Sequence, residues 1–324
     1  MTRRRASRYR RPDTVPVVHL TPDDEAILWH VARHRLIDGA MLYDLFPHRS
    51  EQKFSKRLRD LYRAGFLERI EQHARRRPGG GSYPLIYALA RQGARHLQTT
   101  YGSRVNPSRL TQKNAELKAW SIEHTLATTR FMVGLERAAR KRDGAGVDYF
   151  DQLAAEFPEA RYSSTGLPYT LRTHIDWKGK RGEVGTAPDQ IFRLMMPGGS
   201  RYLFLEIDRA TETIAPADGQ HGRPEFWRNS SILKKLLIYA AAANPKRKPP
   251  FGLPGFQVLM VTESPGRAAA MQAAYQQHLT KGTVTAKPNV FLFTDWQSIE
   301  AGGGDVLAAP IRNGLGKEFG FYLG

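Results

Sequence analysis

Two short apolar runs separated by glycines restrict the fold of this chain more than any other feature of its sequence. Residues 190–196 and residues 202–208 are rich in aliphatic and aromatic side chains, and Gly198-Gly199-Ser200 lies between them. Runs of this length joined by a Gly-Gly turn predict an antiparallel β-hairpin. The second run is apolar almost throughout, which is typical of a buried central strand.

Three carboxylates lie on this hairpin. Asp189 precedes the first run, and Glu206 and Asp208 lie two apart on the second, so these two share a face of their strand. Converging carboxylates repel one another unless a hard cation binds between them, and Mg²⁺ or Mn²⁺ takes oxygen ligands of this kind. The pattern predicts a metal-dependent phosphodiester site with Asp189, Glu206 and Asp208 as metal ligands. The alternative is a strand-entry residue followed by a solvated strand face.

The helical segment that follows, at about residues 225–243, carries two adjacent lysines. Lys235 and Tyr239 lie one turn apart on one helical face, so we expect Lys235 to reach the carboxylates. In that position its ammonium group orients water or stabilises developing negative charge. Tyr239 is then a packing or hydrogen-bonding residue, and Lys234 is the alternative cation.

These residues resemble the PD-(D/E)XK nuclease superfamily. Pro188-Asp189 is followed, after 16 residues, by Glu206-x-Asp208, where that superfamily more often has Glu-x-Lys. In several of its branches the lysine lies on the following helix, the place that Lys235 has here. A narrower resemblance, from about residue 20 to residue 295, is to the replication-relaxation proteins of plasmids and integrative elements, which overlap the MOBC relaxases. It rests on Pro188-Asp189-x-x-Phe192, Phe204-x-Glu206-x-Asp208-Arg209-x-Thr211-Glu212 and Lys235-Leu236-x-x-Tyr239.

The resemblance implies a Mg²⁺-dependent endonuclease or nickase that cuts DNA at an origin through water-mediated hydrolysis, with Asp189, Glu206, Asp208 and Lys235 as catalytic residues. It places Glu123, on a helix preceding the nuclease strands, as a further metal ligand. The implied partners are double-stranded DNA of the origin region, other relaxosome proteins and a coupling ATPase. The alternative is a non-catalytic replication or transfer initiator, or a repressor, that uses a decayed nuclease fold as a scaffold. The missing lysine of Glu-x-Lys keeps that alternative open.

The charge of the chain favours a polyanionic partner. Its formal net charge is +18, and residues 1–110 hold 22 basic and 10 acidic residues, so 22 − 10 = +12 of that charge lies in the first third. Without cysteine the chain has neither disulfides nor a thiolate zinc site. The basic start lacks an apolar signal region, and no apolar stretch is long enough for a membrane segment, so we expect a soluble cytoplasmic protein.

The N-terminal third has the pattern of a winged helix-turn-helix. Helices are expected at residues 22–34, at residues 39–46 and from residue 51, and strands at residues 66–70 and 85–89. The third helix and the loop between the strands carry the basic residues expected to bind DNA: Lys53, Lys56, Arg57, Arg59, Arg63, Arg75, Arg76 and Arg77. The alternative is a protein-docking module.

The expected fold is therefore mixed α/β, with an N-terminal winged helix-turn-helix and a C-terminal restriction-endonuclease-like core. We expect a disordered basic arm at residues 1–19, the winged helix at residues 20–100, a linker at residues 101–111, the nuclease-like domain at residues 112–300 and a weakly ordered tail at residues 301–324. Motifs of ATP-binding loops, of serine hydrolases and of His-Glu-x-x-His zinc sites are absent.

Overall fold

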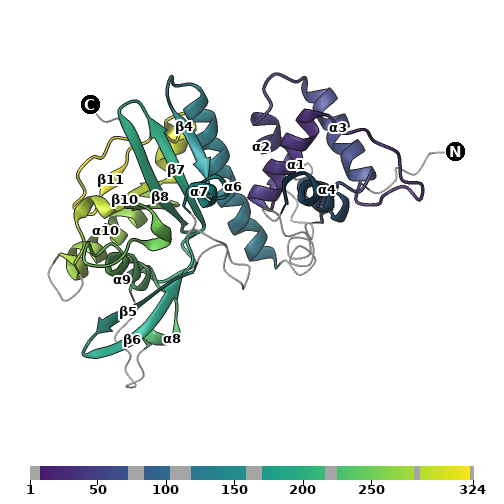
Figure 1. The fold of residues 1–324 in the computed structure, drawn as a ribbon. Coiled ribbons are helices and arrows are strands. Elements are labelled where there is room, and N and C mark those ends of the chain that lie inside the picture. Colours follow the sequence, from purple (N-terminus) through teal and green to yellow (C-terminus); the bar gives the residue numbers. More distant parts are fainter. Residues whose placement is uncertain are drawn as a thin grey trace. The chain divides into compact units, whose positions relative to one another are not determined.

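The computed structural model describes residues 8–71, 84–102, 118–157, 170–215, 225–280 and 285–321 (Figure 1). The chain divides into two compact units, residues 1–133 and residues 134–324. Both helices and sheets are present, which confirms the mixed α/β class.

The boundary between the units lies within helix α6 (Ala119–Arg140), later in the chain than the boundary expected near residue 110. The reason is that the first part of α6 packs in the N-terminal unit. Ile122 joins a buried cluster with Leu36 and Ile86, and the Thr129 hydroxyl donates to the Leu36 carbonyl oxygen at 2.8 Å. Most of the predicted linker, residues 103–111, lies outside the described residues.

The N-terminal unit contains the elements expected of its sequence, with bounds that agree within a few residues. A three-stranded antiparallel sheet has the order β1-β3-β2, and a helix follows it. The elements are α1 (Pro22–His34), β1 (Ile37–Asp38), α2 (Gly39–Asp44), α3 (Glu51–Arg63), β2 (Leu67–Ile70), β3 (Ile86–Leu89) and α4 (Arg91–Tyr101). The β2–β3 connection, with Arg75, Arg76 and Arg77, lies outside the described residues.

Local sequence signals explain these bounds. Thr21 caps α1 by accepting from the Asp24 backbone N–H, and the Asp24 carboxylate accepts from the Thr21 N–H at 2.7 Å, which forms a capping box. On α3, Phe54, Leu58 and Leu61 form the predicted buried stripe. The helix is then followed by Gly65 with φ +81°, a conformation that favours glycine.

Part of the N-terminal arm is ordered against this unit, which corrects the expectation of disorder through residue 19. The Arg11 guanidinium donates to the carbonyl oxygens of Tyr62 and Leu67, at 3.0 and 2.9 Å, and to the Glu68 carboxylate at 2.8 Å. In return, the Tyr62 hydroxyl donates to the Tyr9 carbonyl oxygen at 2.6 Å. Arg11 satisfies carbonyl groups where α3 ends and β2 begins, a role that the charge pattern of the arm does not indicate.

The C-terminal unit is built on a six-stranded sheet with the order β11-β10-β9-β8-β7-β4. Strands β8, β9 and β10 are parallel, and the remaining pairs are antiparallel. The predicted hairpin is confirmed as β7 and β8, which pair in the register Gln190↔Leu205. The strands are β4 (Gly146–Tyr149), β7 (Gln190–Met196), β8 (Gly199–Ile207), β9 (Gln257–Thr262), β10 (Phe291–Asp295) and β11 (Arg312–Asn313).

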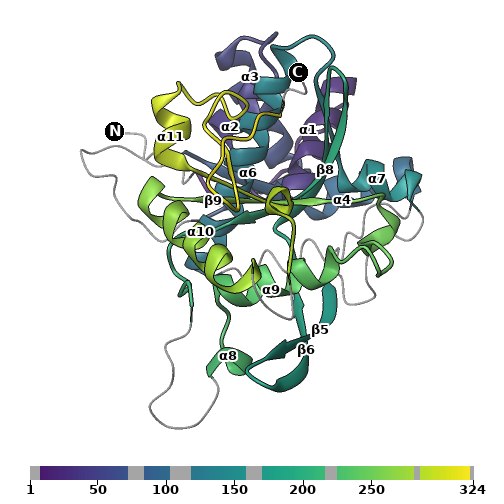
Figure 2. The same cartoon turned by 90° about the vertical axis from the view of Figure 1, so that its left-hand side faces the viewer.

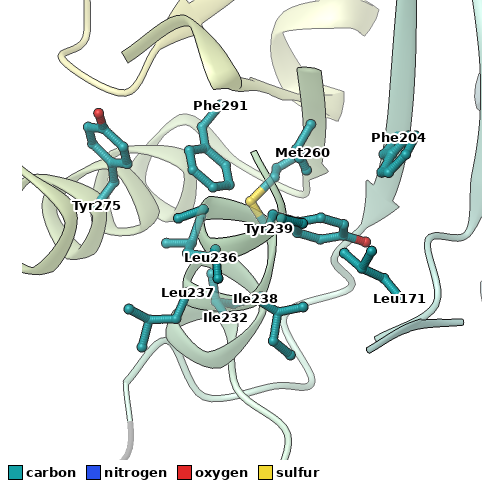
Figure 3. Close-up of a cluster of buried hydrophobic side chains, with 14 of the residues drawn as sticks. Leu171, Phe204, Ile232, Leu236, Leu237, Ile238, Tyr239, Met260, Tyr275 and Phe291 are labelled. Carbon is teal, nitrogen blue, oxygen red and sulfur yellow. The ribbon is translucent and has the colours of Figure 1, made fainter. Parts of the chain in front are cut away.

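Helices α9 and α10 pack on one face of this sheet. Leu236 and Tyr239 of α9 and Tyr275 of α10 lie in one core with Met260 and Phe291 of the sheet (Figure 3). In the described part of the chain, no helix combines the length and apolar character that a membrane span requires. The helices of this unit, besides α6, are α7 (Phe150–Glu156), α8 (Glu225–Arg228), α9 (Ile232–Ala242), α10 (Pro265–Leu279) and α11 (Trp296–Ala301), with short 3-10 turns η2 (Pro250–Gly252) and η3 (Pro288–Val290).

A second, two-stranded sheet lies beyond α9. Strands β5 (Leu171–Trp177) and β6 (Lys180–Thr186) form an antiparallel hairpin, and both views place α9 between it and the large sheet (Figures 1 and 2). Leu171, Ile175 and Val184 of the hairpin join the same core as α9. The C-terminal unit thus has a further layer on its α9 side.

The segment after residue 300 is structured, which corrects the expectation of a weakly ordered tail for residues 301–321. Strand β11 extends the sheet beside β10, and Val306, Ile311 and Phe321 are buried. These apolar residues are irregularly spaced among glycines and prolines, so no helical or strand period indicates their burial.

Candidate functional site

Asp189 and Glu206 lie near each other at one end of the β7–β8 hairpin. The β7–β8 register ends at the pair Gln190↔Leu205, just after Asp189 and just before Glu206, and the Asp189 charge acts on Glu206. The Asp189 N–H donates to the Leu205 carbonyl oxygen at 2.9 Å, and its carboxylate accepts from the Ile207 N–H at 2.7 Å. The alternation of β8 places Glu206 on the same face as Phe204, which packs in the core with α9.

Helix α9 brings a cation and a hydroxyl to Glu206. Ser231 caps the helix by accepting from the Lys234 N–H, and the helix is otherwise almost entirely apolar. Lys235 Nζ lies 2.9 Å from Glu206 Oε2, and the Tyr239 hydroxyl donates to Glu206 Oε1. The two α9 side chains, one turn apart, therefore bind the two oxygens of one buried carboxyl group.

Glu212 is a further acidic residue of this site that sequence reasoning did not assign. Its Oε2 lies 3.3 Å from Lys235 Nζ, and its Oε1 accepts from the Ser230 hydroxyl at 3.1 Å. The loop that carries it is fixed to the start of α9, because Ile232 N–H donates to the Thr213 carbonyl oxygen at 3.0 Å. Its place at the end of the Asp-Arg-x-Thr-Glu motif is the sequence signal that could have indicated it.

Burial and charge set the protonation of this cluster. Burial raises the pKa of Glu206 to about 7, and the Asp189 charge adds to this, while Lys235 and Tyr239 oppose it. Burial lowers the pKa of Lys235, but the charges of Glu206, Glu212 and Asp189 outweigh it and raise that pKa overall. Burial and Glu206 raise the pKa of Tyr239 well above its usual value. Near pH 7, Lys235 is charged, Tyr239 is a neutral donor, and Glu206 is poised between its two forms.

The neighbouring lysine points elsewhere. Lys234 Nζ donates to the carbonyl oxygens of Trp227 and Asn229, at 3.2 and 3.4 Å. The geometry therefore selects Lys235, rather than Lys234, as the cation of the Glu206 site.

Asp208 lies in a separate ion pair, so the structure brings together only two of the three predicted carboxylates. Its oxygens accept from Arg267 Nε and Nη2, at 2.6 and 3.0 Å, and from the Thr262 hydroxyl at 2.7 Å. Burial raises the pKa of Asp208, but these hydrogen bonds outweigh burial and lower it overall. The prediction that Asp208 shares a strand face with Glu206 fails because β8 ends at Ile207. Asp208 lies beyond that end, where it binds Thr262 of β9 and Arg267 of α10.

The remaining acidic residues offer the donor chemistry that Mg²⁺ or Mn²⁺ takes. Asp189 and Glu206 are neighbouring carboxylates, and the buried Glu212 Oε2 has Lys235 Nζ at 3.3 Å. The carboxylate oxygens of these three acidic residues do not all lie within 4.8 Å of one another in the described residues, and Lys235 is the cation paired with Glu206 and Glu212. Glu123, the further predicted ligand, lies on the part of α6 that belongs to the N-terminal unit, and its metal role stays a prediction.

The predicted DNA-binding helix α3 carries two kinds of basic residue. Lys53, Lys56, Arg59 and Arg63 are exposed. Arg57 is instead paired with the buried Asp24, at 2.7 Å from Nε to Oδ1, and donates to the His19 carbonyl oxygen at 2.7 Å. Arg57 thus holds α3 to α1, unlike its exposed neighbours.

Comparison with known proteins identifies the family. No curated protein and no solved structure gives a match to this chain. The family model described as replication-relaxation matches residues 28–223, which is more than half of the chain. The match includes Asp189, Glu206 and Glu212 and ends before α9, which supplies Lys235. On this match, the chain belongs to the replication-relaxation family.

Proposed function

We propose that this protein binds duplex DNA at an origin of a plasmid or integrative element and nicks it by metal-dependent, water-mediated hydrolysis. Its family indicates a role in the replication or transfer of such an element. The observation that carries the catalytic part is the ammonium of Lys235, which lies 2.9 Å from the Glu206 carboxyl group, with the Asp189 charge acting on both groups.

The residues of this cluster have distinct roles in the proposed reaction. Asp189, Glu206 and Glu212 would hold Mg²⁺ or Mn²⁺, which when bound supplies an acidified water and neutralises charge on the scissile phosphate. Lys235 stabilises the negative charge that develops on the phosphate oxygens, and burial strengthens that effect. Tyr239 keeps the Glu206 carboxyl group oriented through its hydrogen bond. Hydrolysis by water leaves no covalent bond between protein and DNA.

Binding of DNA is assigned to the N-terminal unit. The exposed face of α3 carries Lys53, Lys56, Arg59 and Arg63, and helices in this position of a helix-turn-helix enter the major groove. The net positive charge of +12 in residues 1–110 is complementary to the negative charge of a phosphate backbone. These features support duplex DNA as the partner.

The test is nicking of a supercoiled plasmid that carries the origin of the element, in Mg²⁺ or Mn²⁺. Asp189→Ala, Glu206→Ala and Lys235→Ala should each abolish nicking and retain DNA affinity. Lys234→Ala is the matched control, because it removes an adjacent lysine whose Nζ binds backbone carbonyl groups instead. If wild-type protein nicks no such plasmid, or if Lys234→Ala and Lys235→Ala behave alike, the proposed catalytic site is wrong.

A second candidate is a non-catalytic initiator or repressor built on the same fold. Both oxygens of Glu206 are engaged by Lys235 and Tyr239. Asp208 stands where the lysine of a Glu-x-Lys motif would be, and it binds Arg267. On this reading the cluster is a stabilising ion-pair network. Normal plasmid transfer or replication by the Asp189→Ala and Glu206→Ala variants would favour it.

A further inference from the structure

The β5–β6 hairpin forms a firmly held projection of the C-terminal unit. Its turn is tight, with positive φ at both Lys178 and Gly179, the backbone that two-residue hairpin turns favour. Trp177 stacks on Phe226 of α8, with ring centroids 4.6 Å apart. Gly182 lies under Trp227, where a Cβ atom would come within 2.6 Å of the indole ring.

The hairpin gathers basic residues from two distant segments. The loop at residues 244–249, which follows α9, is tied to β5 because Arg247 Nη1 donates to the Thr173 hydroxyl at 2.5 Å. Residues 171–186 and 244–249 together hold seven Lys and Arg and two Asp and Glu, so 7 − 2 = +5. The exposed basic residues of this surface, called here the basic hairpin surface, are Arg172, Lys178, Lys180, Arg181, Lys246, Arg247 and Lys248.

The two carboxylates of this surface neutralise only part of its charge. The hairpin register places Asp176 opposite Arg181 and Glu183 opposite His174. The two segments hold seven basic and only two acidic residues. The surface therefore keeps a net positive charge along its length, which complements a row of phosphates.

The base of the hairpin lies beside the candidate site. Strand β6 ends at Thr186, three residues before Asp189, and α9, which carries Lys235, packs against both hairpin strands. A strand of seven residues spans about 20 Å, which corresponds to about six base pairs at about 3.4 Å per step. The hairpin thus extends from the site over a distance that one duplex segment covers.

We propose that the basic hairpin surface binds the sugar-phosphate backbone of the duplex whose neighbouring phosphate is presented to Asp189, Glu206 and Lys235. The proposal rests on the proposed function and adds a second DNA contact, made by the C-terminal unit itself. The surface contacts phosphates in a sequence-independent manner and fixes the position of the duplex relative to the site.

The first test is the salt dependence of duplex binding by the full-length protein. A tip variant with Lys178→Ala, Lys180→Ala and Arg181→Ala should lower the slope of log K against log salt by about 2 to 3, at about 0.9 per lost phosphate contact. The control, with Lys287→Ala, Arg312→Ala and Lys317→Ala, removes the same charge near β11 and should leave the slope unchanged. Equal slopes for the two triple variants would overturn the proposal.

Because Lys180 also lies 6.0 Å over the Trp227 ring, a second variant guards against a folding effect. Lys246→Ala combined with Lys248→Ala leaves the hairpin intact and should lower the slope by about 1 to 2. A loss of binding to vesicles of anionic phosphatidylglycerol, with DNA binding unchanged, would assign the surface to a membrane and overturn the proposal.

The second test maps the contact on the DNA. The chain has no cysteine, so Asp176→Cys provides a single attachment point near the hairpin tip for an iron chelate that cleaves nearby DNA. Cleavage should fall within about six base pairs of the nick, and the exposed Gln297→Cys of α11 should give none there. Nicking without cleavage from Asp176→Cys overturns this proposal alone. Chelate cleavage at one discrete origin position, with no nicking, supports the contact and refutes the catalytic function.

Discussion

Lys235 and Glu206 form a buried ion pair between α9 and β8, with Nζ 2.9 Å from Oε2. The pKa values of both residues are raised. A raised pKa favours the neutral acid form of Glu206 and the charged ammonium form of Lys235. The difference follows from burial, because the Glu206 side chain is 2% exposed and that of Lys235 is 18% exposed. Glu206 is therefore the more strongly desolvated of the two groups, and the charged form of Lys235 is stabilised by three neighbouring carboxylates.

Removal of Lys235 should destabilise the protein through the charge left on Glu206. At pH 8, Lys235→Met should lower the free energy of unfolding by about 3 kcal/mol, as expected when one partner of a buried pair is lost. Lys234→Met should cost about 1 kcal/mol or less, because its Nζ donates to backbone carbonyl groups and lies 6.0 Å from the centre of the Phe226 ring. Urea denaturation at pH 8 measures both. In a Glu206→Gln background the cost of Lys235→Met should shrink, and an unchanged cost would contradict the pair.

Two arginines on α3, two residues apart, should separate stability from DNA binding. Arg57 binds the buried Asp24, so Arg57→Ala should lower the free energy of unfolding by about 3 kcal/mol. Arg59 is exposed, so Arg59→Ala should leave stability within about 0.5 kcal/mol and weaken duplex binding. Thermal unfolding and fluorescence anisotropy measure the two effects. The opposite pattern would place Arg57, rather than Arg59, on the DNA.

The contribution of the Asp24–Arg57 pair should disappear in acid. Burial raises the pKa of Asp24, but hydrogen bonds from Arg57 and Thr21 outweigh it and hold the pKa below 3.8. Because the folded-state pKa is lowered, the pair stabilises the protein above the unfolded-state pKa, and this is lost as pH falls through the folded-state pKa. Asp24→Asn should therefore be destabilising at pH 7 and nearly neutral near pH 2. An equal penalty at both pH values would show that shape, rather than charge, sets the cost.

Several elements follow directly from the sequence because local interactions determine them. The Thr21 cap and Pro22 fix the start of α1, and the Gly-rich turn fixes the β7–β8 hairpin. Lys235 could be chosen as a candidate cation because helical spacing puts it on the same face as Tyr239. In each case residues close in sequence decide the geometry.

The features that the sequence did not reveal depend on residues far apart in the chain. Asp208 was assigned to the carboxylate cluster by strand parity, whereas Arg267, 59 residues later, binds it. Arg11 is ordered by carbonyl groups more than 50 residues away. The basic hairpin surface likewise needs the contact between Arg247 and Thr173. Such pairings are set by the tertiary fold, and no local period encodes them.

Asp208 should be dispensable for metal binding because Arg267 and Thr262 already occupy its oxygens. Asp208→Asn should lower stability, since it weakens the ion pair with Arg267, yet leave Mn²⁺ affinity within about twofold, less than about 0.5 kcal/mol. Asp189→Asn should lower that affinity by tenfold or more, about 1.4 kcal/mol. Water-proton relaxation with Mn²⁺ measures both. If Asp208→Asn loses the metal as severely as Asp189→Asn, Asp208 is a ligand after all.

Glu206 should make the unfolding free energy fall as pH rises, which is the reverse of the Asp24 case. Its pKa in the folded protein is about 7, above the ordinary value of 4.5, so the folded state holds the proton more tightly than the unfolded state. Stability from this group is complete below about pH 4.5 and is lost as pH rises through about 7. Glu206→Gln keeps the neutral shape at every pH. Relative to wild type, it should gain roughly 2 to 3 kcal/mol between pH 5 and pH 8, as measured by urea denaturation without metal. Mn²⁺ added at pH 8 should reverse the ranking, because only the ionised carboxylate of wild type binds it. If the unfolding free energies of wild type and Glu206→Gln change in parallel between pH 5 and pH 8, Lys235 keeps Glu206 ionised throughout. In that case the burial of Glu206 does not control its charge.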